Sequence, residues 1–511
     1  MPDEPIDLPV TRLLEGLASG RWSAEELTRE HIARIEAVDP LVNAVTEARF
    51  DAAMAEARAA DVRRASDTGV LPPLLGVPCT IKEFFAVEGM PWTGGLQHRA
   101  RVRADHDAVA VQRLRAAGAV ILATTNAPEG GLWMETHNDL YGRTNNPWDL
   151  RRTSGGSSGG EGALVASGAS PFGLGSDIGG SVRIPAAFCG TFGHKPSGLT
   201  IPNGGHFPPA SPGTEPYLCA GPLARSADDL DLLLEVLSGP DGAGPAHRVH
   251  RRSRVADGDL SGVRFLALET NGRVSVSRSL RGAVAQAAAS LESRGATRIH
   301  AELPGLRDAF GIWSAMLAEA SDVHYETILT GQGELPLLRE LAALPFGRSR
   351  HTFAALAITA ADRLIAPFAG TRGRFVEAGL QLLAAVEDVL GPDGVLLHPP
   401  YSRAAPRHHD AWRTPLDAQY TAIFNVLELP VTVVPAGFEP SGLPLAVQVA
   451  AGRGRDALTL RVARALEADL GGWVRAEPVP PRRGALSGWT GGTGTGRALP
   501  AERQPRAPSS G

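Results

Sequence analysis

Two serine clusters flanked by glycine lie close together in the sequence, and one of them could form an acyl-transfer site. In "SDIGGSVR", Gly179 and Gly180 can adopt backbone conformations closed to other residues, so successive N–H groups can converge on one point. The serine that follows, Ser181, could attack a carbonyl carbon while these N–H groups stabilise the developing oxyanion. The other cluster is the pair Ser157 and Ser158, which lies upstream.

A serine nucleophile needs a base, and the composition singles out lysine for that role. The chain has 14 histidines, but none lies in a recognisable triad setting. Only two of its 50 lysine and arginine residues are lysines, Lys82 and Lys195. The abundance of alanine, glycine and arginine is typical of a high-GC genome, in which replaceable lysines become arginines. Because arginine stays protonated whereas a buried lysine can lose its proton, either lysine is a candidate base unless it survived by chance.

Other interpretations of the glycine- and serine-rich segment 151–190 fit its sequence less well. A flexible hinge would lack the embedded small and apolar runs "ALVASG" and "VRIPAAF". A Walker phosphate loop needs Gly-Lys-Ser/Thr, a dinucleotide fingerprint needs G-x-G-x-x-G after a strand, and neither pattern fits this segment. "GGSSG" (155–159) matches the G-x-S-x-G nucleophile elbow, but that motif requires a preceding strand, and "NNPWDLRRTS" is too polar for one.

Composition excludes several other classes of protein. A net charge of −5 gives no general attraction to nucleic acid or to anionic membranes. The three cysteines are widely spaced, which argues against a disulfide framework and a cysteine-based metal site. No apolar run approaches the roughly 18 residues of a membrane span, and the first residues do not form a secretion signal. We therefore expect a soluble, reduced, cytoplasmic protein without stable membrane insertion.

An α/β scaffold is predicted to position the candidate residues. The capping box from Ser23 to Glu26 opens a helix that should end at Asp39-Pro40, and further helices are expected at 48–65 and 106–117. Short apolar runs separated by helical segments predict a largely parallel sheet covered on both faces. The expected strands are 76–83, 119–125, 262–268, 394–400, 429–436 and 443–451. Segment 239–262 reads as a surface loop, and the chain from 478 onward as a disordered tail.

Three motifs together resemble the amidase signature family. They are "GVPCTIKE", the block "GGSSGGEGALVASGASPFGLGSDIGGSVRIPAAFCGTFGHKPS", and "ELPVTVVPAGFEPSGLPLAVQVAA". The block is closest to that of the fatty acid amide hydrolases, including its glutamate, where many amidases have serine. The resemblance covers roughly residues 10 to 470. It implies one large α/β domain, residues 1–477, with a mixed twisted β-sheet covered by helices on both faces, followed by the tail 478–511.

The resemblance also implies a catalytic triad of serine, cis-serine and lysine. Matched residue by residue, the lysine is Lys82, the cis-serine is Ser157 and the nucleophile is Ser181. The implied oxyanion hole consists of the backbone N–H groups of Ile178, Gly179, Gly180 and Ser181. The implied reaction needs no metal and no organic cofactor.

The neighbours of these residues are expected to support the structure. Ser158 should cap the helix that follows it. Asp177 and Arg183 should form an ion pair that holds the nucleophile loop. Lys195 is expected to make structural hydrogen bonds, because the resemblance gives it no catalytic role. Surface or loop positions are expected for His137, His206, His408 and His409.

The resemblance predicts an amidase that hydrolyses an acyl or aryl amide, with a lipophilic acyl group among the candidates. The alternatives are a glutaminase component of a tRNA-dependent amidotransferase, an ester-preferring hydrolase with a histidine base, and a non-enzymatic binding protein. The apolar segment 348–370 favours an ordinary cover helix over a cap that touches a membrane. The expected partner is a small-molecule amide, not nucleic acid, and the resemblance allows a homodimer.

Overall fold

The structure is a computed structural model that describes residues 4–67, 69–242, 247–252, 258–331, 333–365 and 372–479. The tail expected from residue 478 lies outside the described residues except for its first two positions. Segment 239–262 is described only in part, and its described residues form no helix or strand.

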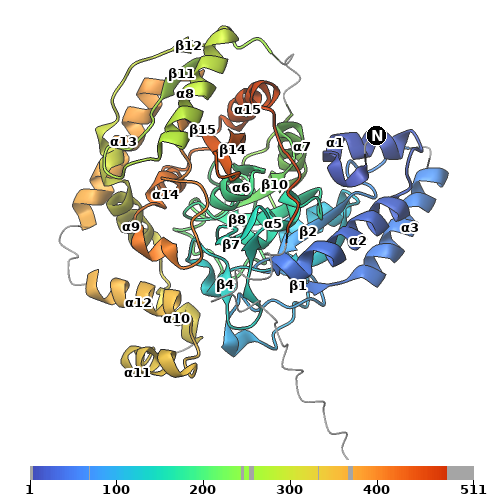
Figure 1. The fold of residues 1–511 in the computed structure, drawn as a ribbon, viewed down its shortest axis with the longest axis horizontal. Coiled ribbons are helices and arrows are strands. Elements are labelled where there is room, and N and C mark those ends of the chain that lie inside the picture. The colour runs from blue at the N-terminus through green and yellow to red at the C-terminus, as the bar shows by residue number, and fades with distance from the viewer. Residues whose placement is uncertain are drawn as a thin grey trace, which may run out of the picture.

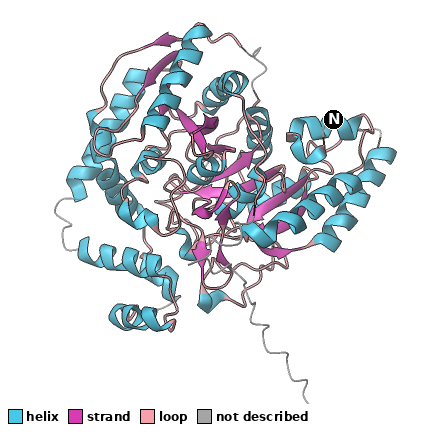
Figure 2. Ribbon diagram, viewed as in Figure 1, coloured by secondary structure: helices cyan, strands magenta, loops and turns pink. Residues whose placement is uncertain are grey.

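The centre of the molecule is one mixed sheet, around which the helices are arranged (Figures 1 and 2). In the described residues this sheet has 11 strands. In spatial order they are β1 (Val45–Ala48), β3 (Val120–Thr125), β2 (Pro78–Lys82), β8 (Phe172–Asp177), β10 (Cys219–Ala224), β9 (Phe192–Lys195), β14 (Val431–Phe438), β15 (Pro444–Ala451), β13 (Gly394–His398), β11 (Arg264–Ala267) and β12 (Thr297–Arg298).

The sheet is mixed, so the prediction of a largely parallel sheet from the strand–helix alternation is wrong. β2 runs parallel to both of its neighbours, β3 and β8, whereas β8 pairs antiparallel with β10, and β14 pairs antiparallel with β15. The loop between β14 and β15 is too short for the crossover of a dozen or more residues that parallel neighbours need. The mixed sheet flanked by helices that the family resemblance implies is confirmed.

Most of the described helices flank the sheet, and those at 325–365 pack together to one side of it (Figure 1). The described helices are α1 (Val10–Ala18), α2 (Ala24–Val42), α3 (Phe50–Ser66), α4 (Val109–Ala116), α5 (Gly159–Ala166), α6 (Arg183–Cys189), α7 (Ala227–Leu237), α8 (Arg278–Ser293), α9 (Ala309–Ala320), α10 (Tyr325–Thr330), α11 (Leu337–Ala343), α12 (Phe353–Ile365), α13 (Arg372–Leu390), α14 (Gln419–Val426) and α15 (Asp456–Leu470). Two small ribbons lie outside the main sheet: β4 (His137–Asn138) with β5 (Gly142–Arg143), and β6 (Asn145–Asn146) with β7 (Asp149–Thr153).

Helix α2 begins where its sequence predicts but ends later than predicted. The predicted capping box is present, with both the Ser23 side chain and the Glu26 side chain bonded to backbone N–H groups. The predicted end at Pro40 is wrong, because the helix continues to Val42 and ends at Asn43, whose φ of 51° is left-handed. The helix therefore continues for two residues past Pro40, although proline has no N–H to donate to the carbonyl oxygen four residues earlier.

The apolar segment expected at 348–370 contains α12, and its residues 366–370 lie outside the described part. Ala355 and Leu356 of α12 are buried in a cluster with Tyr325 and Leu329 of α10. This contact agrees with a cover helix. None of the helices within the described ranges is long and apolar enough to cross a bilayer.

Candidate active site

Lys82 is the last residue of β2, in a part of the sheet with strands on both sides. Its side chain is fully buried. Burial lowers the pKa of Lys82 from its usual 10.5 to about 7, although the negative charges of Asp177 and Glu161 act in the opposite direction. A lysine with this pKa is partly neutral near neutral pH, so it can accept a proton.

The Lys82 amine contacts the first serine cluster directly. Its Nζ lies 2.7 Å from Ser157 Oγ, and Ser157 is only 2% exposed. The Gly156–Ser157 peptide bond is cis, as the resemblance implies. A side chain at Gly156 would overlap the backbone of Trp133, so the serine can be presented in this position only because glycine precedes it.

Ser181 lies in the turn between β8 and α6, next to the first serine cluster. The Ser158 N–H donates to the Ser181 carbonyl oxygen at 3.0 Å, which joins the backbones of the two clusters. Ser181 is partly exposed, whereas Ser157 and Lys82 are buried. The three residues thus pass from the open side of the site to its closed interior.

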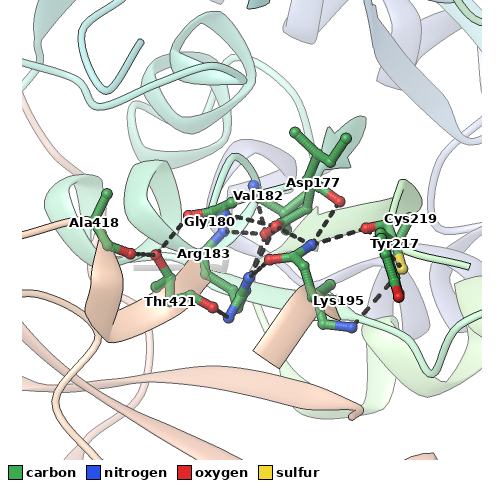
Figure 3. A network of polar contacts seen from close by, with 12 residues as sticks. Asp177, Gly180, Val182, Arg183, Lys195, Tyr217, Cys219, Ala418 and Thr421 are labelled. Carbon is green, nitrogen blue, oxygen red and sulfur yellow. Dashed lines mark hydrogen bonds and ion pairs between the residues drawn. The ribbon is translucent and has the colours of Figure 1, made fainter. Parts of the chain in front are cut away.

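The predicted ion pair between Asp177 and Arg183 is present and fully buried (Figure 3). The Arg183 guanidinium donates to both carboxylate oxygens of Asp177, at 2.9 and 3.0 Å. Arg183 also donates to the Thr421 carbonyl oxygen and to the side chain of Asn425 on α14. Although burial alone would raise it, the Arg183 charge and hydrogen bonds hold the pKa of Asp177 well below its usual range. The pair therefore joins the nucleophile loop to α14.

The expected oxyanion hole needs one correction. The Gly180 N–H donates to Asp177 Oδ1 at 2.7 Å, so it is not available to a substrate oxygen (Figure 3). Aspartate often binds a backbone N–H three residues downstream in this way. Within the described part of the chain, the N–H groups of Ile178, Gly179 and Ser181 have no partner. Three of the four expected donors remain.

Side chains from distant helices hold the carbonyl groups of this loop. Trp313 on α9 donates from Nε1 to the Ile178 carbonyl oxygen at 2.9 Å, and Thr421 donates to the Gly179 carbonyl oxygen at 2.8 Å. In a trans peptide the N–H of the next residue points away from the carbonyl. The Trp313 bond therefore fixes the direction of the Gly179 N–H.

Gly180 could not be replaced by another residue without strain. Its φ is 125°, and a Cβ here would overlap the hydroxyl of Thr421. The same threonine holds the Gly179 carbonyl oxygen, so close packing at Gly180 is part of what shapes the loop.

The expected capping role of Ser158 is only half right. Ser158 is the residue before α5, but its side chain makes no cap bond. Its hydroxyl instead faces the backbone of Ser176 on β8, at 3.3 Å from the carbonyl oxygen. The Gly159 N–H in the first turn is bonded by Thr136 Oγ1 at 3.2 Å. Ser158 therefore ties the loop to the sheet.

The strand predicted to be absent before "GGSSG" does exist, as β7. It pairs with β6 and, through Arg152, bridges to Arg407, but it lies outside the main sheet. It therefore does not present a nucleophile at the end of a central strand as the elbow motif requires. The serine inside that pattern is Ser157, which the Lys82 amine contacts.

The second lysine and the four histidines singled out in the sequence differ in how far they are buried. Lys195 is buried and its Nζ donates to the Pro196 carbonyl oxygen at 2.8 Å, which agrees with the expected structural role. His206 lies in a loop, as expected, and is only 5% exposed. His137 and His408 are partly buried, and His409 is exposed.

Sequence reasoning missed two buried polar residues beside Lys82. Ser176 Oγ lies 3.1 Å from Lys82 Nζ and 2.9 Å from His206 Nε2. Glu161 on α5 accepts hydrogen bonds from Thr80 and Thr125, which lie on β2 and β3 next to the lysine. Of these, only Glu161 had a sequence signal, as the glutamate in the glycine- and serine-rich block.

No group of three or more histidine, cysteine, aspartate or glutamate side chains in the described ranges is placed to hold a metal ion. The arrangement instead combines a buried amine, a hydroxyl in contact with it, a half-open serine and the backbone N–H groups of Ile178, Gly179 and Ser181. Such a set can transfer an acyl group.

Comparison with known proteins agrees with this chemistry. The family model described as Amidase matches residues 26–460. The zebrafish fatty-acid amide hydrolase 2-B is 40% identical over 92% of this chain and 90% of its own length. One component of the glutamyl-tRNA(Gln) amidotransferase of Chloroflexus aurantiacus is 31% identical, over 90% of this chain and 96% of its own. The crystal structure of a bacterial aryl acylamidase of the amidase signature family superposes with a TM-score of 0.76 at 26% identity, covering 90% of this chain and 96% of that one.

Proposed function

The chain belongs to the amidase family and is an amide-hydrolysing enzyme, and from that premise we propose that it works through a triad of Ser181, Ser157 and Lys82. The observation that carries the proposal is the 2.7 Å contact between the buried Lys82 amine and Ser157 Oγ. A neutral lysine at this distance is within reach of the hydroxyl proton that it must remove.

In the proposed mechanism the proton moves from the partly exposed Ser181 toward the buried Lys82, while Ser181 attacks the substrate. Lys82 takes the proton of Ser157, which takes the proton of Ser181 as its Oγ attacks the amide carbon. The N–H groups of Ile178, Gly179 and Ser181 stabilise the resulting oxyanion. This arrangement requires Ser181 to face the substrate, and its partial exposure supports that role.

The second half of the reaction reverses the proton path. The proton returns through Ser157 to the leaving nitrogen, which must be protonated to depart. Water then attacks the acyl-enzyme, and Lys82 again accepts the proton. The cycle uses only groups of this chain and requires neither a metal nor an organic cofactor.

For the substrate we propose an acyl or aryl amide, including amides with a lipophilic acyl group. The support is the 40% identity to a fatty-acid amide hydrolase, against 31% to the amidotransferase component. A glutaminase role in a multicomponent complex is the second candidate, and ester cleavage through the same triad is the third. Fold alone does not choose among them, because substrate loops vary within one fold.

The test compares the purified chain with Ser181→Ala on acetamide, benzamide, long-chain fatty amides and glutamine, measured by release of ammonia. We expect turnover of at least one non-glutamine amide and a loss of at least about 10³-fold in kcat for the variant. Equal rates for the two proteins would rule out Ser181 as the nucleophile. Turnover of glutamine alone would favour the amidotransferase role.

A further inference from the structure

The Lys82 amine contacts two serine hydroxyls, and only one of them belongs to the proposed triad. Ser157 Oγ lies at 2.7 Å and Ser176 Oγ at 3.1 Å. A neutral amine has two N–H donors and one lone pair. To take a proton from Ser157, Lys82 must direct that lone pair at Ser157 and an N–H at Ser176. Something must therefore prevent Ser176 from donating its own proton to the lone pair.

His206 determines which way the Ser176 proton points. Its Nδ1 lies 2.8 Å from the Pro208 carbonyl oxygen, which can only accept, so Nδ1 carries the ring proton. Burial also lowers the pKa of His206 to about 3, so the ring is neutral over the working pH range. In this tautomer Nε2 has a lone pair and no hydrogen.

The only hydrogen available between Ser176 and His206 is consequently that of the serine. The two atoms are 2.9 Å apart, so the Ser176 hydroxyl donates to His206 Nε2. Its remaining lone pairs face Lys82 Nζ, where they can accept an N–H and cannot donate. The lone pair of Lys82 is left for Ser157.

The surroundings of His206 hold the ring in this orientation. The ring makes T-shaped contacts with Phe85, with ring centroids 5.0 Å apart, and with Phe84, at 5.9 Å. The His206 backbone pairs with Phe85 in an isolated bridge, and its N–H donates to the Asn203 carbonyl oxygen at 2.9 Å. The histidine is thus fixed at both its backbone and its ring.

We propose that His206 is a positioning residue of this amidase, which accepts the Ser176 proton and thereby directs the Lys82 lone pair toward Ser157. The proposal rests on the triad proposed above. His206 does not touch the substrate and acts only through Ser176. Its loss should therefore reduce the chemical step and leave substrate binding unchanged.

The experiment is a double-mutant cycle with His206→Phe, Ser176→Ala and the double variant, assayed on the best amide found for the wild type. Phenylalanine keeps the ring that packs on Phe84 and Phe85 but has no acceptor for the Ser176 proton. We expect His206→Phe to lose about tenfold or more in kcat with KM changed less than about threefold. Ser176→Ala should lose less, because it removes the competing donor together with the acceptor of the Lys82 N–H. The double variant should be no slower than the slower single variant, because both changes break one path.

The matched control is His31→Phe, which replaces another buried neutral histidine, on α2, whose ring bonds a backbone carbonyl oxygen. Its kcat should equal that of the wild type. Should His206→Phe fail to fold, His206→Leu also lacks the acceptor and takes its place in the cycle.

The outcomes separate the two proposals. A folded His206 variant with wild-type kcat, or losses that multiply in the double variant, would overturn the positioning role while leaving the triad intact. Activity that survives Ser181→Ala would instead overturn the proposed function. A change in KM alone would assign His206 to substrate binding and would also contradict the proposal.

Discussion

At the scale of single residues, the candidate site is arranged by depth. Ser181 is partly open, Ser157 is 2% exposed and Lys82 is fully buried. In the proposed mechanism the base has no direct access to solvent, so its proton travels through Ser157 in both directions. The lowered pKa of Lys82 and the position of Ser157 therefore serve the same proposed proton transfer.

The pKa of Lys82 predicts the pH dependence of the rate. Below about pH 7 the lysine is protonated and cannot act as a base, whereas above that value it is neutral. We expect kcat/KM to rise as the pH increases through about 7 and then to level off. A profile from pH 5 to 10 on a neutral amide substrate measures this, and a rate that is flat across pH 7 would contradict it.

Burying Lys82 should also lower the stability of the fold. Its pKa falls from 10.5 when unfolded to about 7, so the unfolded chain binds more protons between these values and stability rises with pH across that window. Lys82→Met should therefore be inactive yet more stable, on the order of a few kcal/mol below pH 7. The gain should shrink toward pH 10.5. Denaturant unfolding of both proteins at pH 6 and pH 10 tests this, and a gain that is equal at both pH values would count against it.

The site residues predicted from the sequence are identified by residue type and spacing, whereas those that were missed are identified only by contacts in the folded protein. Lys82 and Ser181 were selected by type, as a rare lysine and a serine after two glycines. His206 could not be selected, because its role depends on Ser176, 30 residues away, and on burial by aromatic rings. The Gly180 N–H was assigned wrongly, since spacing alone does not show that the Asp177 carboxylate takes it.

At the scale of elements, neighbouring strands of the sheet bring together the proposed base and the loop of the proposed nucleophile. β2 ends at Lys82. Its parallel neighbour β8 ends at Asp177, directly before the loop that carries Ser181. The carboxyl ends of the two strands therefore meet at one edge. The sequence patterns located β2 and the motif that follows β8. The direction of the other strands depends on loop lengths and long-range pairing, which periodicity does not encode.

Helix α9 is predicted to control the oxyanion hole through Trp313. Trp313→Phe keeps the aromatic packing but removes the bond to the Ile178 carbonyl oxygen, so the Gly179 N–H is less firmly aimed. We expect kcat to fall several-fold to about tenfold with little change in KM. Steady-state kinetics measure both parameters.

Trp473→Phe is the matched control, because the indole N–H of Trp473 has no partner among the described residues. It should leave kcat unchanged. If Trp313→Phe behaved like this control, the proposed role of α9 would be wrong.

At the scale of the whole molecule, the site depends on contacts between segments that lie far apart in the chain. Arg183 bonds the Thr421 backbone, 238 residues away, and α14 contributes Asn425 to the same network. The final described segment is held too: the Ala476 N–H donates to the Ala166 carbonyl oxygen, and Arg34 pairs with Glu477. From these contacts we propose that the domain extends to about residue 477.

Removal of residues 480–511 should leave the enzyme intact. The contacts of Ala476 and Glu477 remain, and the removed sequence is low in apolar residues. We expect the thermal midpoint to change by less than about 2 °C and kcat/KM by less than about twofold. A scanning calorimetry trace and an amide assay compare the two chains, and a loss of more than about 5 °C would mean that the tail contributes to the fold.

Both lysines of the chain are fully buried, which has a practical consequence for handling the protein. The folded surface carries its positive charge on arginine and offers no ε-amine to solvent. Amine-directed dyes, cross-linkers and surface-coupling reagents should therefore leave both ε-amines of the folded chain unmodified. Reaction at Lys82 or Lys195 would consequently report unfolding, without an engineered label.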